Sequence, residues 1–432
     1  VKEMVKNILE ISHKNITLLS NLAESDIFWD KIIEIREEFL DGWVYDLTVP
    51  ETNNFIAGFG GIVCHNSYTG AVIAEEMVAL PDDIKQNLSV ILIDTMGIYW
   101  SMKYKNTKEL DLLKKWNMKP KAFDLRFFVP KIHTKYYEDV GIKPIPFIIP
   151  CNEISAEDWL LTFGFSLLDE HGIAIERAVK NVRKKKKIYN IDDIIAEVEA
   201  DNKIEQKVKD AIVNRFLMAK DWGVFGEKGT SILDIFQPGK ISVLDISHYM
   251  RVAAGWGVRS MIVGLLARRA FNERLKARKM EEFEVMTGEK RKTIPMIWFV
   301  IDECHQFLPA EGQTAASEPL LTLVKEGREP GISILMITQM PNKLHQEALA
   351  QADLIISHRL TARSDLESLR SIMQTYVLED IQELINSLPR QKGTAIILDD
   401  NSERMYAVQI RPRLSWHAGG SPSAIKEKGL FD

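Results

Sequence analysis

Cysteine is scarce in this sequence, and its three cysteines, Cys64, Cys151 and Cys304, form no CxxC pair. This spacing argues against a disulfide framework and a cysteine-ligated zinc site, and it predicts a reducing, cytoplasmic location. Long apolar runs are also absent, because none reaches the roughly 18–20 residues that a membrane-spanning helix needs. The charged, amphipathic first residues lack the apolar core of a signal peptide. We therefore expect a protein that works away from membranes.

Charge of one sign is not in large excess either. The formal net charge is −6, with 55 Lys and Arg against 61 Asp and Glu, so any surface that binds nucleic acid must be local. One basic run, Lys184 to Lys187, fits either a solvated helix end or a contact to a phosphate backbone. The length of 432 residues and the apolar share of 46% predict two or three globular units.

Short apolar strands alternate with amphipathic helices after residue 66, and this pattern predicts a mostly parallel sheet covered by helices on both faces. A β-rich stretch, WVYDLTVPETNNFIAGFGGIVCHN, precedes this region. Residues 100–230 contain several amphipathic helices and are expected to form a helical or mixed insertion. The expected strands are 89–94, 125–130, KISVLDIS, IPMIWFVIDE, ISILMITQ, DLIISHRL and a final edge hairpin of GTAIILDD and ERMYAVQI.

Two adjacent carboxylates, Asp302 and Glu303, follow the apolar run MIWFVI. Acids at the end of a buried strand are costly unless a cation is present, and in P-loop NTPases the first acid holds Mg²⁺. The second acid can orient and deprotonate the attacking water. A purely structural alternative is that both acids cap the next helix. The neighbouring segments favour the catalytic interpretation.

Two further polar residues belong to the same pattern. Gln339 ends the next strand, ISILMITQ, where an amide can sense the γ-phosphate or position water. Arg328 lies between the two strands, where a guanidinium could reach the nucleotide of a neighbouring subunit as an arginine finger. The alternative for Arg328 is a surface ion pair with Glu326 or Glu329.

These segments together resemble the HerA/FtsK superfamily of archaeal and bacterial ATPases, and its HerA-like branch in particular. The similarity covers roughly residues 67–415 and is carried by IWFVIDECHQFLP, KEGREPGISILMITQMPNKL, LIISHRL and ILIDTMGIYW. It implies a RecA-like P-loop NTPase fold with ATP and Mg²⁺ as ligands, and a homo-hexamer that moves DNA, in some members with a nuclease that processes DNA ends. It also implies that Asp94, Gly97 and Tyr99 lie near the nucleotide.

The phosphate-binding loop that this resemblance requires is missing. No GxxxxGK[ST] string occurs in the sequence, although such a loop supplies the N–H groups and the lysine that cradle phosphates. The segment SYTGAVIAEEM, residues 67–77, looks like the continuation of the loop. Ser67 would then bind Mg²⁺, with Tyr68 and Thr69 beside the nucleotide. The residues before Ser67 are instead IVCHN.

Residues 27–66 resemble the C-terminal end of an intein, on the segments IFWDKIIEIREEF and VYDLTVPETNNFIAGFGGIVCHN and on the His-Asn-Ser ending. The resemblance implies that the Ser67 hydroxyl accepts the upstream segment by ester exchange. Asn66 would then cyclise onto its own backbone carbonyl, with His65 transferring protons and Asp46 assisting from a neighbouring strand. The alternative, an ordinary His-Asn-Ser turn, does not account for the truncated phosphate loop beside it.

The sequence thus predicts an α/β chain of five parts. The spliced product is expected to be an ATP hydrolase that moves DNA, whereas the 432-residue chain, as an intein-interrupted precursor fragment, is expected to be inactive. Two alternatives stay open: another motor of the superfamily, such as a conjugation or secretion ATPase, and a fragment whose only activity is splicing. The expected parts are a small β-rich intein (Hint) segment (1–66), the start of the ATPase core (67–99), the insertion (100–230), the remaining core (231–415) and a flexible tail (416–432).

Overall fold

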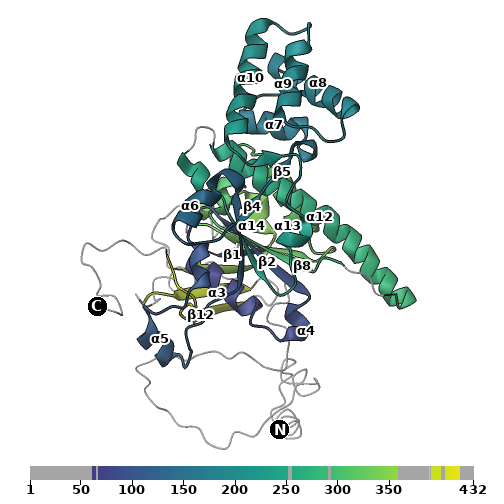
Figure 1. The fold of residues 1–432 in the computed structure, drawn as a ribbon. Coiled ribbons are helices and arrows are strands. Elements are labelled where there is room, and N and C mark those ends of the chain that lie inside the picture. Colours follow the sequence, from purple (N-terminus) through teal and green to yellow (C-terminus); the bar gives the residue numbers. More distant parts are fainter. Residues whose placement is uncertain are drawn as a thin grey trace, which may run out of the picture. The chain divides into compact units, whose positions relative to one another are not determined.

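A computed structural model describes residues 61–64, 67–251, 255–289, 293–358, 389, 391–399 and 404–418 of the chain (Figure 1). The chain divides into two compact units, Val1–Thr48 and Val49–Asp432, and every described residue lies in the second. The helices and strands predicted for residues 1–60, together with Asp46, His65 and Asn66, lie outside the described residues. The tail after residue 418 lies outside them as well.

The centre of the second unit is one sheet with the strand order β12-β11-β10-β1-β9-β8-β2-β7-β3-β4. Its neighbours from β10 to β4 run parallel, whereas β10–β11 and β11–β12 are antiparallel, so the predicted parallel sheet and edge hairpin are confirmed. The strands are β1 (Gly61–Cys64), β2 (Leu88–Asp94), β3 (Leu125–Pro130), β4 (Ile145–Phe147), β7 (Ile241–Asp245), β8 (Met296–Ile301), β9 (Ile332–Ile337), β10 (Ala352–His358), β11 (Thr394–Asp399) and β12 (Arg404–Gln409).

The apolar runs form strands because both faces of the sheet are covered. In β8, Phe299 packs into one apolar cluster, whereas its neighbours Trp298 and Val300 pack into the cluster on the opposite face. The same alternation holds in β2, where Ile91 and Leu92 belong to different clusters. Successive side chains of a strand point to opposite faces, so a strand without polar residues needs two apolar layers.

Helix α3 (Ser67–Met77) covers one face through buried Ala71, Ala74 and Met77. Helices α12 (Gly255–Thr287) and α13 (Ser317–Glu326) contribute side chains to the cluster on the other face. The shorter helices near the sheet are α4 (Asp82–Lys85), α5 (Leu110–Lys115), α6 (Thr134–Asp139), α11 (Ile232–Ile235) and α14 (Gln346–Ala350). Within the part of the chain that the structure describes, no helix combines the length and apolar character needed to cross a membrane.

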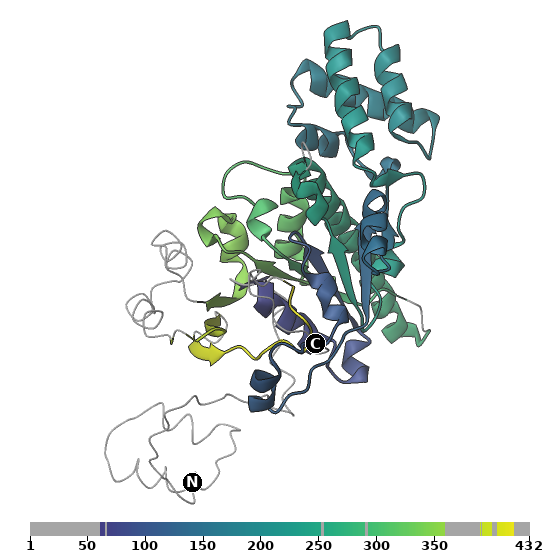
Figure 2. The ribbon, with the colours of Figure 1, turned by 60° about the vertical axis from the view of Figure 1, so that its left-hand side comes forward.

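The expected insertion, residues 100–230, is divided between two structures. Its first part contributes β3 and β4 to the central sheet, which the sequence pattern left out of the core. Helices α7 (Ala156–Phe163), α8 (Glu170–Lys185), α9 (Ile191–Ala200) and α10 (Gln206–Asp221) gather together in Figures 1 and 2. Capping boxes at Ser155 and Asn190 start α7 and α9. Two short strands, β5 (Ile149–Pro150) and β6 (Phe225–Gly226), pair outside the main sheet.

Candidate functional site

The acid pair lies at the C-terminal end of β8, near the middle of the sheet. The Asp302 side chain is buried, and its Oδ1 accepts hydrogen bonds from Ser67 Oγ at 2.8 Å and from the Glu303 backbone N–H at 3.1 Å. Its Oδ2 is buried with no hydrogen-bond partner. Burial raises the pKa of Asp302 to about 6, against the lowering effect of these two donors. One carboxylate oxygen is therefore held by the Ser67 hydroxyl while the other is left for a ligand.

Glu303 follows β8 with a backbone conformation that differs from that of a strand. Its φ of 49° lies in the left-handed region, which is uncommon for a residue other than glycine. The Gln339 side-chain amide donates to its Oε1 at 3.2 Å, and His305 Nδ1 lies 3.4 Å from its Oε2. Burial, and then the neighbouring Asp302, raise the pKa of Glu303 to about 7. A carboxylate with that pKa is suited to accept a proton near neutral pH.

Ser67 is held in place by a second buried residue. The Tyr99 hydroxyl donates to the Ser67 carbonyl oxygen at 3.2 Å, and its side chain is fully buried. Asp94, at the end of β2, accepts hydrogen bonds from the backbone N–H groups of Met96, Gly97 and Tyr99. Asp94 thus shapes the turn that carries Tyr99 toward α3. A direct contact of Asp94 with nucleotide stays a prediction.

The next two residues of α3 use their side chains in protein contacts. The Tyr68 hydroxyl donates to Glu109 Oε2 at 3.0 Å and accepts the Arg413 backbone N–H at 2.7 Å. Thr69 is buried, and its Oγ1 lies 2.7 Å from His358 Nε2. Both residues lie in the first turn of α3, and their contact with nucleotide stays a prediction.

Arg328 lies far from this acid pair within its own chain. It occupies the turn between α13 and β9, at the N-terminal end of β9, whereas Gln339 follows the C-terminal end. Its side chain is exposed, and the described residues show no ion pair between Arg328 and Glu326 or Glu329. The site therefore brings together Ser67, Asp302, Glu303 and Gln339. Arg328 lies at the opposite end of the strands, before β9.

Arg259 is a residue that the sequence interpretation missed. It belongs to α12, is 1% exposed, and donates from Nη2 to the Gln306 side-chain oxygen at 2.6 Å, while its Nε is buried without a partner. Its positive charge lowers the pKa of both Asp302 and Glu303. A charged residue between Val258 and Ser260, in a helix segment that is otherwise buried and apolar, was the available signal.

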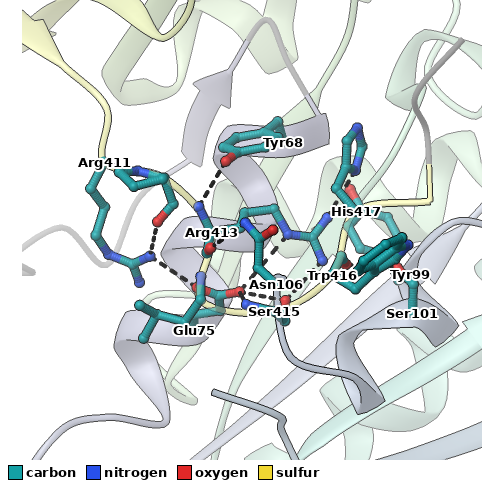
Figure 3. Close-up of polar contacts among 12 residues, drawn as sticks. Tyr68, Glu75, Tyr99, Ser101, Asn106, Arg411, Arg413, Ser415, Trp416 and His417 are labelled. Atoms are coloured by element: carbon teal, nitrogen blue, oxygen red, sulfur yellow. Dashed lines mark hydrogen bonds and ion pairs between the residues drawn. The ribbon is translucent and has the colours of Figure 1, made fainter. Parts of the chain in front are cut away.

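A buried polar cluster beside the site was also missed. The Glu75 carboxylate of α3 is fully buried and accepts hydrogen bonds from Arg411 Nη1, from Ser415 Oγ and from the backbone N–H groups of Leu414 and Ser415. Figure 3 shows Arg411 and Arg413 approaching Glu75 from the C-terminal segment. Residues 411–417 are thereby fastened across the helix that begins with Ser67. The signal in the sequence was an acid among the apolar positions of α3.

The oxygens at this site fit Mg²⁺, which prefers hard oxygen ligands and keeps several ligand positions for water and phosphate. Ser67 Oγ and the unpartnered Asp302 Oδ2 are the protein atoms that could serve it. Among the described residues, no group of three or more His, Cys, Asp or Glu could hold a metal by itself. There is no room for a phosphate-binding loop between β1 and α3, because only His65 and Asn66 separate them.

Two family models divide the chain at the junction before Ser67. Residues 1–66 match the intein splicing domain, and residues 67–269 match the central domain of helicase HerA. The DNA double-strand break repair helicase HerA of Pyrococcus furiosus is 24% identical over 221 residues, which is 47% of this chain and 39% of that protein. The chain therefore spans well under half the length of this relative.

Shorter stretches of the chain are more similar to other proteins. Transcription initiation factor IIB of Methanocaldococcus jannaschii is 52% identical over 50 residues, 11% of this chain and 7% of that protein. A DNA polymerase of Thermococcus sp. (strain GE8) is 49% identical over 49 residues, 11% of this chain and 3% of that protein.

Among solved structures, VirB4 of Thermoanaerobacter pseudethanolicus has a TM-score of 0.50 at 11% identity, over 81% of this chain and 89% of that one. This likeness supports the P-loop NTPase fold that the sequence predicted. Residues 1–66 therefore match an intein splicing domain, and residues 67–269 match the central domain of helicase HerA, on a P-loop NTPase fold.

Proposed function

We propose that the domain hydrolyses ATP to move DNA once Ser67 has been joined to a phosphate-binding loop. The observation that carries this proposal is the 2.8 Å hydrogen bond from Ser67 Oγ to Asp302 Oδ1. It joins the first residue of α3, the helix after β1, to the acid that follows β8, and β8 is the second strand from β1 in the sheet order. In P-loop NTPases these two groups hold the magnesium ion of the nucleotide.

Each residue of the site has one task in this mechanism. Mg²⁺, when bound with ATP, would neutralise charge on the phosphates, held by Ser67 and Asp302. Glu303 accepts the proton of the attacking water, and Gln339, hydrogen-bonded to it, senses the γ-phosphate or orients that water. Asp94, Tyr68 and Thr69 support the start of α3 beside the nucleotide. Arg328 serves the nucleotide of a neighbouring subunit.

DNA as the substrate is supported by the helicase names of the matching family and of the Pyrococcus relative. The same resemblance supports a homo-hexameric ring and a nuclease partner in DNA-end processing. A conjugation or secretion motor of the superfamily is the competing assignment, and stimulation of ATP hydrolysis by DNA distinguishes the two.

A matched set of proteins tests the ATPase proposal. The 432-residue chain should show negligible ATP hydrolysis, because it has no glycine–lysine loop before Ser67. Replacing residues 1–66 by an apolar strand and a GxxxxGK loop should restore hydrolysis, which double-stranded DNA should increase. Glu303→Gln in that protein should abolish turnover. Turnover by the unmodified chain that Glu303→Gln removes would contradict the proposal, and restored activity indifferent to DNA would favour another motor.

We also propose that residues 1–66 splice, since they match the intein splicing domain. In the step that releases the intein, the Asn66 side-chain nitrogen attacks the Asn66 carbonyl carbon, forming a succinimide as the bond to the Ser67 nitrogen breaks. His65 supplies a proton to that leaving nitrogen, and Asp46 assists. The Ser67 oxygen, which holds the upstream segment as an ester by then, transfers it to the freed nitrogen.

Splicing is tested in a precursor that includes the upstream half of the intein. Asn66→Ala should block release of the segment that begins at Ser67, because no other group there can cyclise onto the peptide carbonyl. Asn54→Ala, a change of the same kind in the same segment, is the control and should leave release intact. Unchanged release in the Asn66→Ala precursor would refute the splicing assignment.

A further inference from the structure

Strand β1 matches the intein splicing domain by sequence, but in the structure it is part of the central sheet of the following domain. Its residues, Gly61–Cys64, fall within the stretch that matches the intein splicing domain. The same residues lie between β9 and β10 in the central sheet of the domain that follows. The pairing is parallel on both sides, with Cys64 opposite Ile337 of β9 and Ile356 of β10.

An empty position between β9 and β10 would destabilise the sheet. Strands β9 and β10 lie inside the sheet, and all six residues of β9 are buried. Without a strand between them, the N–H and C=O groups on their facing edges would lose their partners. Each buried backbone group left unpaired costs about 1–3 kcal/mol. The slot between β9 and β10 therefore favours an extended segment that runs parallel to both.

Occupation of the slot by β1 also determines what can precede α3. The strand ends at Cys64 and the helix begins at Ser67, so only His65 and Asn66 connect them. A GxxxxGK loop needs about seven residues between a strand and the serine or threonine that starts the helix. With β1 in the slot, the N-terminus of α3 has no loop that could enclose phosphates.

We propose that the slot between β9 and β10 is a strand-exchange site. The last strand of the intein segment fills it before splicing, and the strand that precedes the ligated phosphate-binding loop fills it afterwards. The inference rests on the proposed splicing and ATPase functions, although occupation of the slot can be measured without either activity.

Two consequences follow from this exchange. Before splicing, the ATPase domain is already folded, and the Ser67 hydroxyl already contacts Asp302. The same strand blocks nucleotide binding, because it leaves no room for the loop. Since a strand can be central in only one sheet, residues 61–64 must leave the slot before they act in an assembled splicing fold.

A cross-link in the full chain tests whether the slot is occupied. Paired residues on neighbouring strands lie within the Cα separation that a disulfide spans, and they point to the same face of a sheet. Ile356→Cys places a thiol opposite Cys64, the natural cysteine of β1. A mild oxidant should then give a disulfide between Cys64 and position 356, identified by mass spectrometry and reversed by a thiol reductant.

The neighbouring residue provides the matched control. Ile355 is buried like Ile356 but faces the opposite apolar cluster, so Ile355→Cys should give little cross-link to Cys64. Absence of the disulfide in a folded Ile356→Cys chain, or equal yields in the two variants, would overturn the proposal. Because these cysteines could destabilise the core, amide exchange in the unmodified chain provides a second measurement. Slow exchange within Gly61–Cys64 supports the slot, and exchange at the rate of an unprotected peptide overturns it.

The result also separates this inference from the proposed function. If the Cys64 cross-link forms but the loop-restored protein has no ATPase activity, the strand-exchange proposal stands and the ATPase proposal fails. If the loop-restored protein hydrolyses ATP but the 432-residue chain gives no Cys64 cross-link, the ATPase proposal stands and the strand-exchange proposal fails.

Discussion

The two acids after β8 are held where ionisation is costly. Burial raises the pKa of Asp302 to about 6 and that of Glu303 to about 7, and the charge of Asp302 adds to the shift of Glu303. The hydroxyl of Ser67, the amide of Gln339 and the guanidinium of Arg259 act in the opposite direction. A site arranged in this way has an ionisation state that changes near neutral pH, where a general base is most useful.

The stability of the unspliced chain should depend on pH through Glu303. The folded pKa of about 7 lies above the ordinary value of 4.5, so between these values the folded state holds a proton that the unfolded chain has released. The free energy of unfolding should therefore fall as pH rises through this window. Glu303→Gln should reduce that fall, measured by urea unfolding at about pH 5 and about pH 8. The exposed Glu329→Gln should not, and an identical fall in all three proteins would contradict the pKa assignment.

Arg259 should set the pH dependence of hydrolysis in the loop-restored protein. Its charge lowers the pKa of Glu303, so Arg259→Met should raise that pKa and move the rising limb of the rate–pH profile to higher pH. Arg259→Lys keeps the charge and should keep the midpoint closer to that of the unchanged protein. A lower rate with an unmoved midpoint in Arg259→Met would mean that Arg259 only packs α12 against Phe307.

At the scale of elements, the C-terminal segment and α3 behave as one piece. Residues 411–417 reach α3 through Glu75 and Tyr68, and the Ser101 hydroxyl donates to the Trp416 carbonyl oxygen at 2.8 Å. A buried carboxylate that loses its charge leaves the facing guanidinium groups without compensation. The placement of Ser67 therefore depends on a segment that is distant in the sequence.

Glu75→Gln should destabilise the chain strongly, since Arg411 and Arg413 would remain buried beside a neutral amide. Breaking a buried ion pair in this way costs about 3–5 kcal/mol. The next residue, Glu76, also pairs with Arg411, but its side chain is 55% exposed, so Glu76→Gln should cost at most about 1 kcal/mol. Urea unfolding of the two variants compares them directly. Equal costs would show that the Glu75 cluster contributes no more than a surface pair.

Most strands were predictable because each is a short apolar run between polar segments, as Leu125–Pro130 illustrates. That pattern could not show that β3 and β4 extend the central sheet, because sheet order depends on contacts between distant parts of the chain. It also could not show that Gly61–Cys64 pairs with β9 and β10. The residues Gly61–Cys64 could form a strand in the intein segment or in the central sheet. Only their pairing with β9 and β10 shows that they belong to the central sheet here.

The candidate site was predictable where its residues end strands or begin helices. The carboxyl ends of parallel strands meet at one end of a sheet, so Asp302 and Gln339 could be expected together, with Ser67 beside them. Arg259 and Glu75 could not be assigned, because their partners Gln306 and Arg411 lie 47 and 336 positions away. Long-range side-chain pairs of this kind leave no local period in the sequence.

At the scale of the whole assembly, the task proposed for Arg328 needs a second copy of the chain. It precedes β9, whereas the acid pair and Gln339 follow the strands, so the six-residue strand β9 lies between them. At about 3.3 Å per residue, this separation is roughly 20 Å, beyond the reach of an arginine side chain. Within a ring, the exposed Arg328 of one subunit could instead face the nucleotide held by the next.

Two inactive variants of the loop-restored protein should therefore restore each other's activity. In mixed rings, a subunit with Arg328→Ala keeps Glu303 and can receive Arg328 from a neighbour that carries Glu303→Gln. Co-expressed with different affinity tags and purified through both, such rings should hydrolyse ATP, whereas rings of either variant alone should not. Rings that combine Arg328→Ala with the double variant Arg328→Ala/Glu303→Gln are the control, because no subunit there supplies the guanidinium. Mixed rings as inactive as this control would place the role of Arg328 outside the active site of a neighbouring subunit.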